Sequence, residues 1–151
     1  ELALKLLARR DHSTSQLRDR LKKNQYSSND IALAISRLTE SRALDDTRSA
    51  IAYARRSANV KLRGKRRTQQ ELQVRGFDFS VASDAVETVF DDIDETAVLE
   101  RAIQKRLSGP VRTRTQFQKL YKALLHQGFP SEAVACALLA RTGSNGSFVE
   151  E

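Results

Sequence analysis

The chain has 151 residues, 30% of them charged and 40% hydrophobic, so it can bury a moderate core and lacks the composition of a disordered protein. Its longest apolar run, AVACALLA at 133–140, falls well short of the roughly 18 residues that span a bilayer, which excludes a membrane protein. The single cysteine, Cys136, excludes an internal disulfide and suits a reducing cytoplasm. Because its neighbours are apolar, we expect Cys136 to be buried.

Hydrophobic residues are spaced for helices along almost the whole chain. They recur at intervals of three, four or seven, as in Leu2/Leu6, Leu17/Leu21, Ile31/Ile35/Leu38, Ala82/Val86/Val89, Leu120/Leu124 and Val134/Leu138. This spacing places each set on one helix face, and no useful stretch alternates with the period of two that a half-buried strand requires. We therefore predict an all-α protein of about nine helices, each roughly 10–15 residues long.

Capping residues and glycines indicate where several helices begin and end. Three pairs have the spacing of an N-cap and the third residue of a first turn: Ser13 with Gln16, Ser27 with Asp30, and Asp92 with Glu95. Gly76 and Gly128 each follow a periodic segment, where a left-handed residue closes the last turn. The first of the corresponding segments has Gln25 in place of glycine, and we expect Asn24 to take the left-handed conformation there.

Three stretches of the chain repeat one pattern. The segment LQVRGFDFSVASDAVETVF (72–90) aligns with LLHQGFPSEAVACALLART (124–142) at an offset of 52 residues. The segment LKKNQYSSNDIALAISRLT (21–39) aligns with the first of these at an offset of 51. In each stretch an aromatic residue follows a tight turn, and an Ala with an aliphatic residue follows on the next helix.

The repetition predicts three tandem three-helix repeats that form an elongated, curved array. The repeats are expected at 1–45, 46–92 and 93–141, followed by a flexible C-terminal tail at 142–151. In such an array the repeats bury their cores against their neighbours. The aromatic residues at the repeated turn are expected to plug the core; they are Tyr26, Phe77 and Phe129.

The sequence offers no constellation of catalytic or cofactor-binding residues. Its two histidines, His12 and His126, are far apart, and each is expected to be solvated or beside a helix cap. No Cys/His set has zinc spacing, and no glycine-rich phosphate loop is present. The acidic clusters DDIDE (91–95) and LDD (44–46) are expected to cap helix starts rather than to hold a metal. We predict no enzyme, no metal and no cofactor.

The excess positive charge lies in about one fifth of the chain. Between Thr47 and Phe77 there are nine Lys or Arg residues and one Glu, whereas the remainder holds 17 cations and 18 anions. The heptapeptide KLRGKRR (61–67) carries five of these cations in a connection that runs into a helix. We expect these cations to lack the carboxylates four positions away that would make a salt-bridged helix surface. Arg55 and Arg56 are expected to end the preceding helix and widen the patch.

A field concentrated in this way attracts polyanions, and we favour phosphate binding over a merely solvated surface. Aromatic residues for base stacking are few, and Tyr53 and Tyr121 are expected to be half-buried within helices. Any contact with nucleic acid is therefore expected to be electrostatic, insensitive to base sequence and weakened by salt.

Four landmarks of the chain resemble those of the bacterial RecX family. They are LLARRDHSTSQLRDRL (6–21), ALDD (43–46) followed by Ala50, Tyr53 and Arg56, ELQVRGFD (71–78) and LLHQGFP (124–130). Their order and spacing extend the resemblance from residue 3 to about residue 141. The sequence departs from the family at Gln16, where Glu is frequent, and at Asn24-Gln25, where glycine is usual; both positions are at helix ends.

The resemblance implies a modulator of the recombinase RecA. Family members bind the RecA filament on single-stranded DNA, lie along its helical groove, and inhibit ATP hydrolysis, strand exchange and coprotease activity. The residues expected to contact the RecA filament or DNA phosphates are Arg55, Arg56, Lys61, Arg63, Lys65, Arg66 and Arg67, with Arg9 and Arg10 as further candidates from the equivalent first helix. We expect a monomer.

The sequence leaves other functions open. The first is a stand-alone, sequence-nonspecific nucleic-acid-binding helical protein that does not act on a recombinase. The second is a scaffold that binds an acidic protein, for which nucleic acid would be a competitor. An enzyme is the weakest alternative, and it would require Asp91, Asp92 and Asp94 to hold a metal.

Overall fold

The computed structural model describes residues 1–143 and 148, and this part of the chain is helical apart from turns and one bridge between Val111 and Thr142. The prediction of an all-α protein with about nine helices is confirmed for these residues. The helices are α1 (Leu2–Arg9), α2 (Thr14–Lys23), α3 (Ser28–Glu40), α4 (Asp46–Asn59), α5 (Lys65–Val74), α6 (Phe79–Asp92), α7 (Glu95–Arg106), α8 (Arg114–His126) and α9 (Ser131–Leu139). Most of the predicted tail, namely 144–147 and 149–151, lies outside the described residues.

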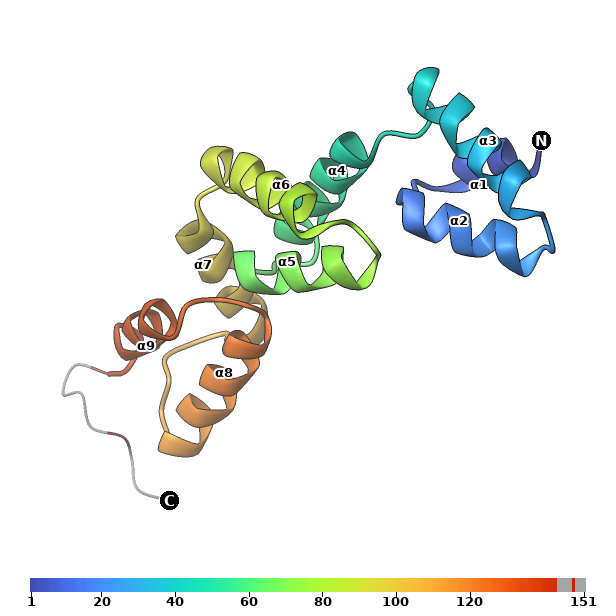
Figure 1. Cartoon of the computed structure of the whole chain (residues 1–151). Coiled ribbons are helices and arrows are strands. Elements are labelled where there is room, and N and C mark those ends of the chain that lie inside the picture. The colour runs from blue at the N-terminus through green and yellow to red at the C-terminus, as the bar shows by residue number, and fades with distance from the viewer. Residues whose placement is uncertain (144–147, 149–151) are drawn as a thin grey trace.

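The helices follow one another as three groups of three along an elongated, curved path (Figure 1). We call α1–α3 the first repeat, α4–α6 the second and α7–α9 the third. The predicted array is therefore confirmed, and we propose the repeat boundaries at residues 45 and 92. None of the helices in the described part of the chain has the length and apolarity to cross a bilayer.

One turn geometry recurs in every repeat. The backbone φ is 63° at Gln25, 88° at Gly76 and 94° at Gly128, so a left-handed residue ends the middle helix of each repeat. The next residue donates its amide to a carbonyl five positions earlier, in the bonds Tyr26 N to Leu21 O, Phe77 N to Leu72 O and Phe129 N to Leu124 O. The expectation for Asn24 was wrong: it ends α2 with φ −90°, and the left-handed residue of this motif comes one position later.

Two of the three predicted caps are present. Ser13 forms a full capping box with Gln16, and the Ser27 side chain accepts the Asp30 amide. The pair Asp92 and Glu95 was wrong because α6 continues through Asp92. The cap of α7 is instead Asp94, which lies within the predicted acidic cluster and accepts the Thr96 amide at 3.0 Å. From the other acidic cluster, Asp45 caps α4 as predicted.

The buried side chains form two separate clusters in the described part of the chain. One belongs to the first repeat and includes Leu17, Leu21 and Ile31, and the other runs continuously through the second and third repeats. The first repeat therefore buries its own core, contrary to the expectation that every repeat buries its core against a neighbour. Phe77 and Phe129 are buried as predicted.

Two other burial predictions failed. Tyr26 is 47% exposed, because no described repeat packs onto the turn of the first repeat. Cys136 is exposed rather than buried. On α9 the buried residues Val134 and Leu138 are four positions apart, so Cys136, midway between them, lies on the opposite helix face.

Polar contacts join the first repeat to the second. Ser13 Oγ donates to the Arg75 carbonyl at 2.7 Å, next to the turn at Gly76. The amide and the hydroxyl of Thr14 both donate to Asp46 Oδ1, at 2.8 and 3.0 Å. We call these contacts the first joint.

Candidate nucleic-acid interface

The basic heptapeptide is divided between a connection and the first turn of a helix. Helix α4 ends at Asn59, three residues after Arg56, so Arg55 and Arg56 lie inside the helix rather than at its end. Leu62 has φ 54° and reverses the chain, which lets the Arg63 amide donate to Ser57 O at 3.1 Å. Helix α5 then begins at Lys65, so its first turn carries three cations.

Three cations in a first turn oppose the helix dipole, whose positive end lies there. The N-cap, Gly64, has no side chain to accept the free amides. Glu95 of the third repeat supplies an acceptor instead, because its Oε2 receives the Lys65 amide at 2.8 Å. A sequence that breaks a local stability rule in this way is typical of a functional site.

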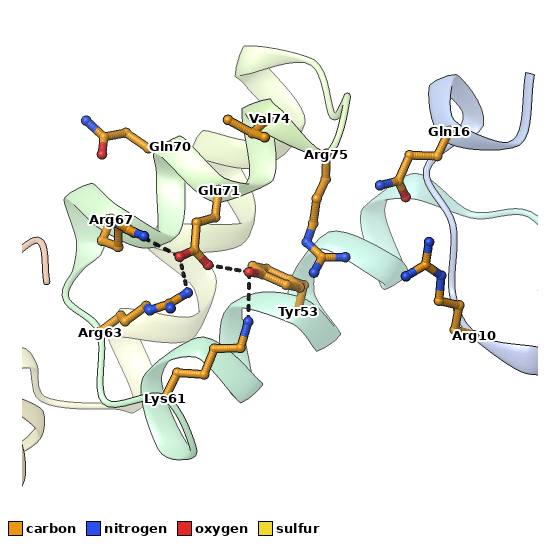
Figure 2. Close-up of a pocket in the computed structure, with 10 residues that line it drawn as sticks. All are labelled: Arg10, Gln16, Tyr53, Lys61, Arg63, Arg67, Gln70, Glu71, Val74 and Arg75. Carbon is orange, nitrogen blue, oxygen red and sulfur yellow. Dashed lines mark hydrogen bonds and ion pairs between the residues drawn. The ribbon is translucent and has the colours of Figure 1, made fainter. Parts of the chain in front are cut away.

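Glu71 holds part of the basic segment in place. Arg67 Nε donates to Glu71 Oε1 at 2.9 Å, Arg63 donates to the same oxygen, and the Tyr53 hydroxyl donates to the other (Figure 2). Lys61 Nζ in turn donates to the Tyr53 oxygen at 3.2 Å. Burial raises the pKa of Glu71, but hydrogen bonds from Tyr53, Arg67 and Arg63 outweigh burial and lower it to about 2.

This network corrects the expectation that the basic segment has no carboxylate four residues away. Glu71 is four residues after Arg67, and the fold also brings Arg63 to it. Arg55 likewise pairs with Asp92 at 3.4 Å. The net charge of the patch is therefore lower than a count of its cations suggests.

A cleft of about 670 Å³ opens beside this network, within the usual size range of a ligand site. We call it the basic cleft. Its lining includes five cations and one anion: Arg10, Lys61, Arg63, Arg67, Arg75 and Glu71. A second cleft of about 330 Å³ adjoins it, shares Arg10, Lys61 and Arg75, and adds Arg56.

The basic cleft thus contains four of the nine predicted contact residues, and the adjoining cleft contains a fifth. Lys65, Arg66, Arg55 and Arg9 do not line either cleft. The Lys65 ammonium lies 6.0 Å from the Phe90 ring centre, and Arg66 lines a separate hollow with His126.

Sequence reasoning missed several polar residues of the clefts, and Glu71, described above, is one of them. Arg75 places its guanidinium 4.3 Å from the centre of the Tyr53 ring, and Lys61 Nζ lies 5.0 Å from the same centre. Tyr53 is half-buried as predicted, but it also organises the cations around it. Gln16 lines both clefts in addition to capping α2. The position of Arg75 just before the turn glycine was the available signal.

The remaining candidate groups have structural explanations. His12 is 2% exposed, so it is not solvated, although it directly precedes the α2 cap. Burial lowers its pKa below the usual 6.5. His126 is exposed in the last turn of α8. Among the described residues, no group of three or more His, Cys, Asp or Glu side chains is placed to hold a metal.

Sequence and structural comparisons give consistent matches. Residues 1–38 match the sequence model of the first three-helix domain of RecX. The chain is 32% identical over 139 residues to Regulatory protein RecX from Vibrio vulnificus, a match that covers 91% of this chain and 89% of the relative. It is 30% identical over 133 residues to Regulatory protein RecX from Chlorobaculum tepidum, covering 87% of this chain and 81% of that one.

The fold is also found in a solved structure. The crystal structure of RecX from Lactobacillus salivarius matches with a TM-score of 0.74 at 20% identity, over 91% of this chain and 92% of that chain. Fold and site define an all-α, three-repeat protein with a cation-lined cleft beside its first joint. Given the identity and coverage of the sequence matches, the chain belongs to the RecX family of regulatory proteins.

Proposed function

We propose that this protein is a negative regulator of the RecA recombinase. In this proposal it acts in the cytoplasm, binds along the groove of the RecA filament on single-stranded DNA, and inhibits ATP hydrolysis, strand exchange and coprotease activity. Membership of a family of regulatory proteins supports a regulatory role. The RecA target comes from the family resemblance of the sequence and is the part that experiment must test.

The basic cleft is the observation that carries the proposal. Lys61, Arg63 and Arg75 come from the second repeat, and Arg10 comes from the first, so cations from two repeats face one opening. Guanidinium groups suit phosphates because they donate in pairs, and Lys61 adds a point charge. A phosphodiester backbone or an acidic protein surface within the filament groove would be complementary to this cleft.

The elongated shape supports binding to an assembled filament. An array of three repeats presents a long surface, which can contact more than one subunit at once. A ligand that contacts adjacent subunits stabilises the filament conformation to which it binds more tightly. Inhibition would follow if that conformation is one in which the filament hydrolyses ATP slowly.

A stand-alone nucleic-acid binder is the second candidate function, and the basic cleft favours it too because DNA phosphates alone would satisfy its cations. The two functions differ in what they do to DNA coated with an unrelated single-strand binding protein. We expect the chain to bind RecA filaments much more tightly than such coated DNA. Equal binding to both would support the stand-alone function and contradict the RecA proposal.

A further inference from the structure

The first joint holds the first repeat to the rest of the molecule without a shared apolar core. In the described part of the chain, the buried side chains of α1–α3 form one cluster and those of α4–α9 form another. The polar contacts across the joint are hydrogen bonds from Ser13 and Thr14, and Ser15 packs closely against Gly76. Each hydrogen bond contributes only modestly to stability, and one bond can break without the others. We therefore expect this joint to resist bending less than a joint built on apolar packing.

The basic cleft lies across this joint. Figure 2 shows Arg10 and Gln16 on the first repeat, pointing toward Arg75 and Tyr53 on the second. The adjoining cleft is built from both repeats in the same way and shares these four residues. An occupant of the clefts would therefore contact both sides of the joint.

The charges on the two sides have the same sign. Arg10 lines both clefts with Arg75 and Lys61. Two acids line the clefts and do not neutralise all three cations, because Asp11 lines only the adjoining cleft and Glu71 is already bound to Arg63 and Arg67. Like charges repel across the opening when it is empty. An anion bound in the opening would attract the cations of both repeats and so offset their mutual repulsion.

We propose that the backbone of a single-stranded nucleic acid binds in the two clefts and fixes the angle between the first and second repeats. Successive phosphates meet Arg10 on one side and Arg75 with Lys61 on the other. A strand suits the site better than one acidic side chain, because the two clefts adjoin each other and share Arg10, Lys61 and Arg75 in their linings. This inference deepens the proposed function and rests on it only for the nature of the polyanion.

The test measures the joint directly and needs no RecA. The protein has one cysteine, Cys136, which is exposed in the third repeat. A second label site, Asn29→Cys, places a probe on the exposed surface of the first repeat. Spin labels at both positions report the distribution of distances between the first and third repeats, with and without a short oligothymidylate.

We expect the oligothymidylate to narrow this distribution. Arg10→Gln should abolish the narrowing and weaken oligothymidylate binding about three- to tenfold, the effect of one partly exposed charge contact. Arg37→Gln is the matched control, since Arg37 is an exposed arginine of the same repeat that lines neither cleft. It should leave both measurements close to those of the parent protein.

Three results would overturn the inference: an unchanged distribution at saturating oligothymidylate, narrowing that survives Arg10→Gln, or equal narrowing by polyglutamate. Failure of the proposed function is separate. If oligothymidylate narrows the distribution but the protein does not inhibit RecA, strand binding at the first joint is supported and the RecA proposal fails. If RecA is inhibited equally by the parent and Arg10→Gln proteins, inhibition does not depend on strand binding at this joint.

Discussion

Ser13 and Gly64 hold the same position in successive repeats, 51 residues apart, and each is the N-cap of a middle helix that bonds to the turn of the next repeat. Ser13 Oγ donates to the Arg75 carbonyl at 2.7 Å, and the Gly64 amide donates to the Gln127 carbonyl at 2.9 Å. The joints are thus themselves repeated. The second joint also lies within a continuous apolar core, so we expect it to resist bending more than the first.

The glycine of the second joint should be intolerant of a side chain. Gly128 has φ 94°, and a Cβ there would lie 2.3 Å from the Arg67 amide nitrogen. Gly128→Ala should therefore lower the free energy of unfolding by about 3 kcal/mol, from backbone strain and overpacking combined. Urea unfolding measures the change. Gly109→Ala is the control because open space surrounds that position, and an equal loss in both variants would contradict the close packing at the joint.

Removing the charge of Glu71 should strengthen binding to DNA. Glu71→Gln keeps the shape of the side chain but leaves Arg63 and Arg67 without their carboxylate partner. We expect affinity for oligothymidylate to rise about fivefold, with a steeper dependence on salt, because the net positive charge of the basic cleft increases. Fluorescence anisotropy over a salt series measures both. Glu87→Gln makes the same charge change at an exposed site on α6, and an equal gain there would show that only total charge matters.

Glu71 should also make stability depend on pH in acid. Its pKa falls from 4.5 to about 2 on folding, so its contribution is complete above about pH 4.5 and is lost as the pH falls toward 2. The shift corresponds to roughly 3 kcal/mol. Unfolding measured from pH 5 to pH 2 should show this loss in the parent protein, and a smaller one in Glu71→Gln. Parallel curves for the two proteins would mean that the network does not stabilise the fold.

Charge reversal on the exposed part of the patch should weaken inhibition of RecA. Arg56, Lys65 and Arg66 are exposed and make no ion pair among the described residues, so their replacement by Glu should spare the fold. Acids at positions 65 and 66 also suit a helix start. We expect the concentration for half-inhibition of RecA ATP hydrolysis to rise at least about tenfold, as for the loss of several phosphate contacts.

The control for that triple variant reverses Lys105, Arg114 and Lys119, which are exposed cations of the third repeat. It changes net charge by the same amount at a distance from the basic cleft. Circular dichroism should show unchanged helicity in both variants. Equal inhibition by the parent and by the Arg56, Lys65 and Arg66 variant would remove these residues from the proposed contact.

The repeats could be predicted because their signal is local. A glycine or its equivalent, an aromatic residue and an Ala-aliphatic pair recur at constant offsets, and each follows from helix geometry within one repeat. The exposure of Tyr26 could not be predicted in this way. It depends on whether another repeat covers the turn, which is a property of the assembled array and not of the segment.

The sequence predicted which kind of residues the candidate site contains, but not which of these residues contact one another. The concentration of cations around residues 61–67 is visible in the sequence. Glu71 pairs with both Arg63 and Arg67 because of how the connection folds at Leu62. Arg10 lies across a joint from Arg75 because of how two repeats meet. Arg10 and Arg75 are 65 positions apart, and the periodicity of a single sequence does not indicate a contact over that separation.

Whether this protein regulates RecA can be tested by adding small amounts of it to preformed RecA filaments. ATP hydrolysis on single-stranded DNA would be followed at protein amounts too small to coat the DNA, at two salt concentrations. We predict that hydrolysis falls at these low ratios, and that more protein is needed for the same fall at the higher salt because the contact of the basic cleft is electrostatic. Inhibition that begins only when the DNA is coated, at either salt concentration, would contradict the proposal.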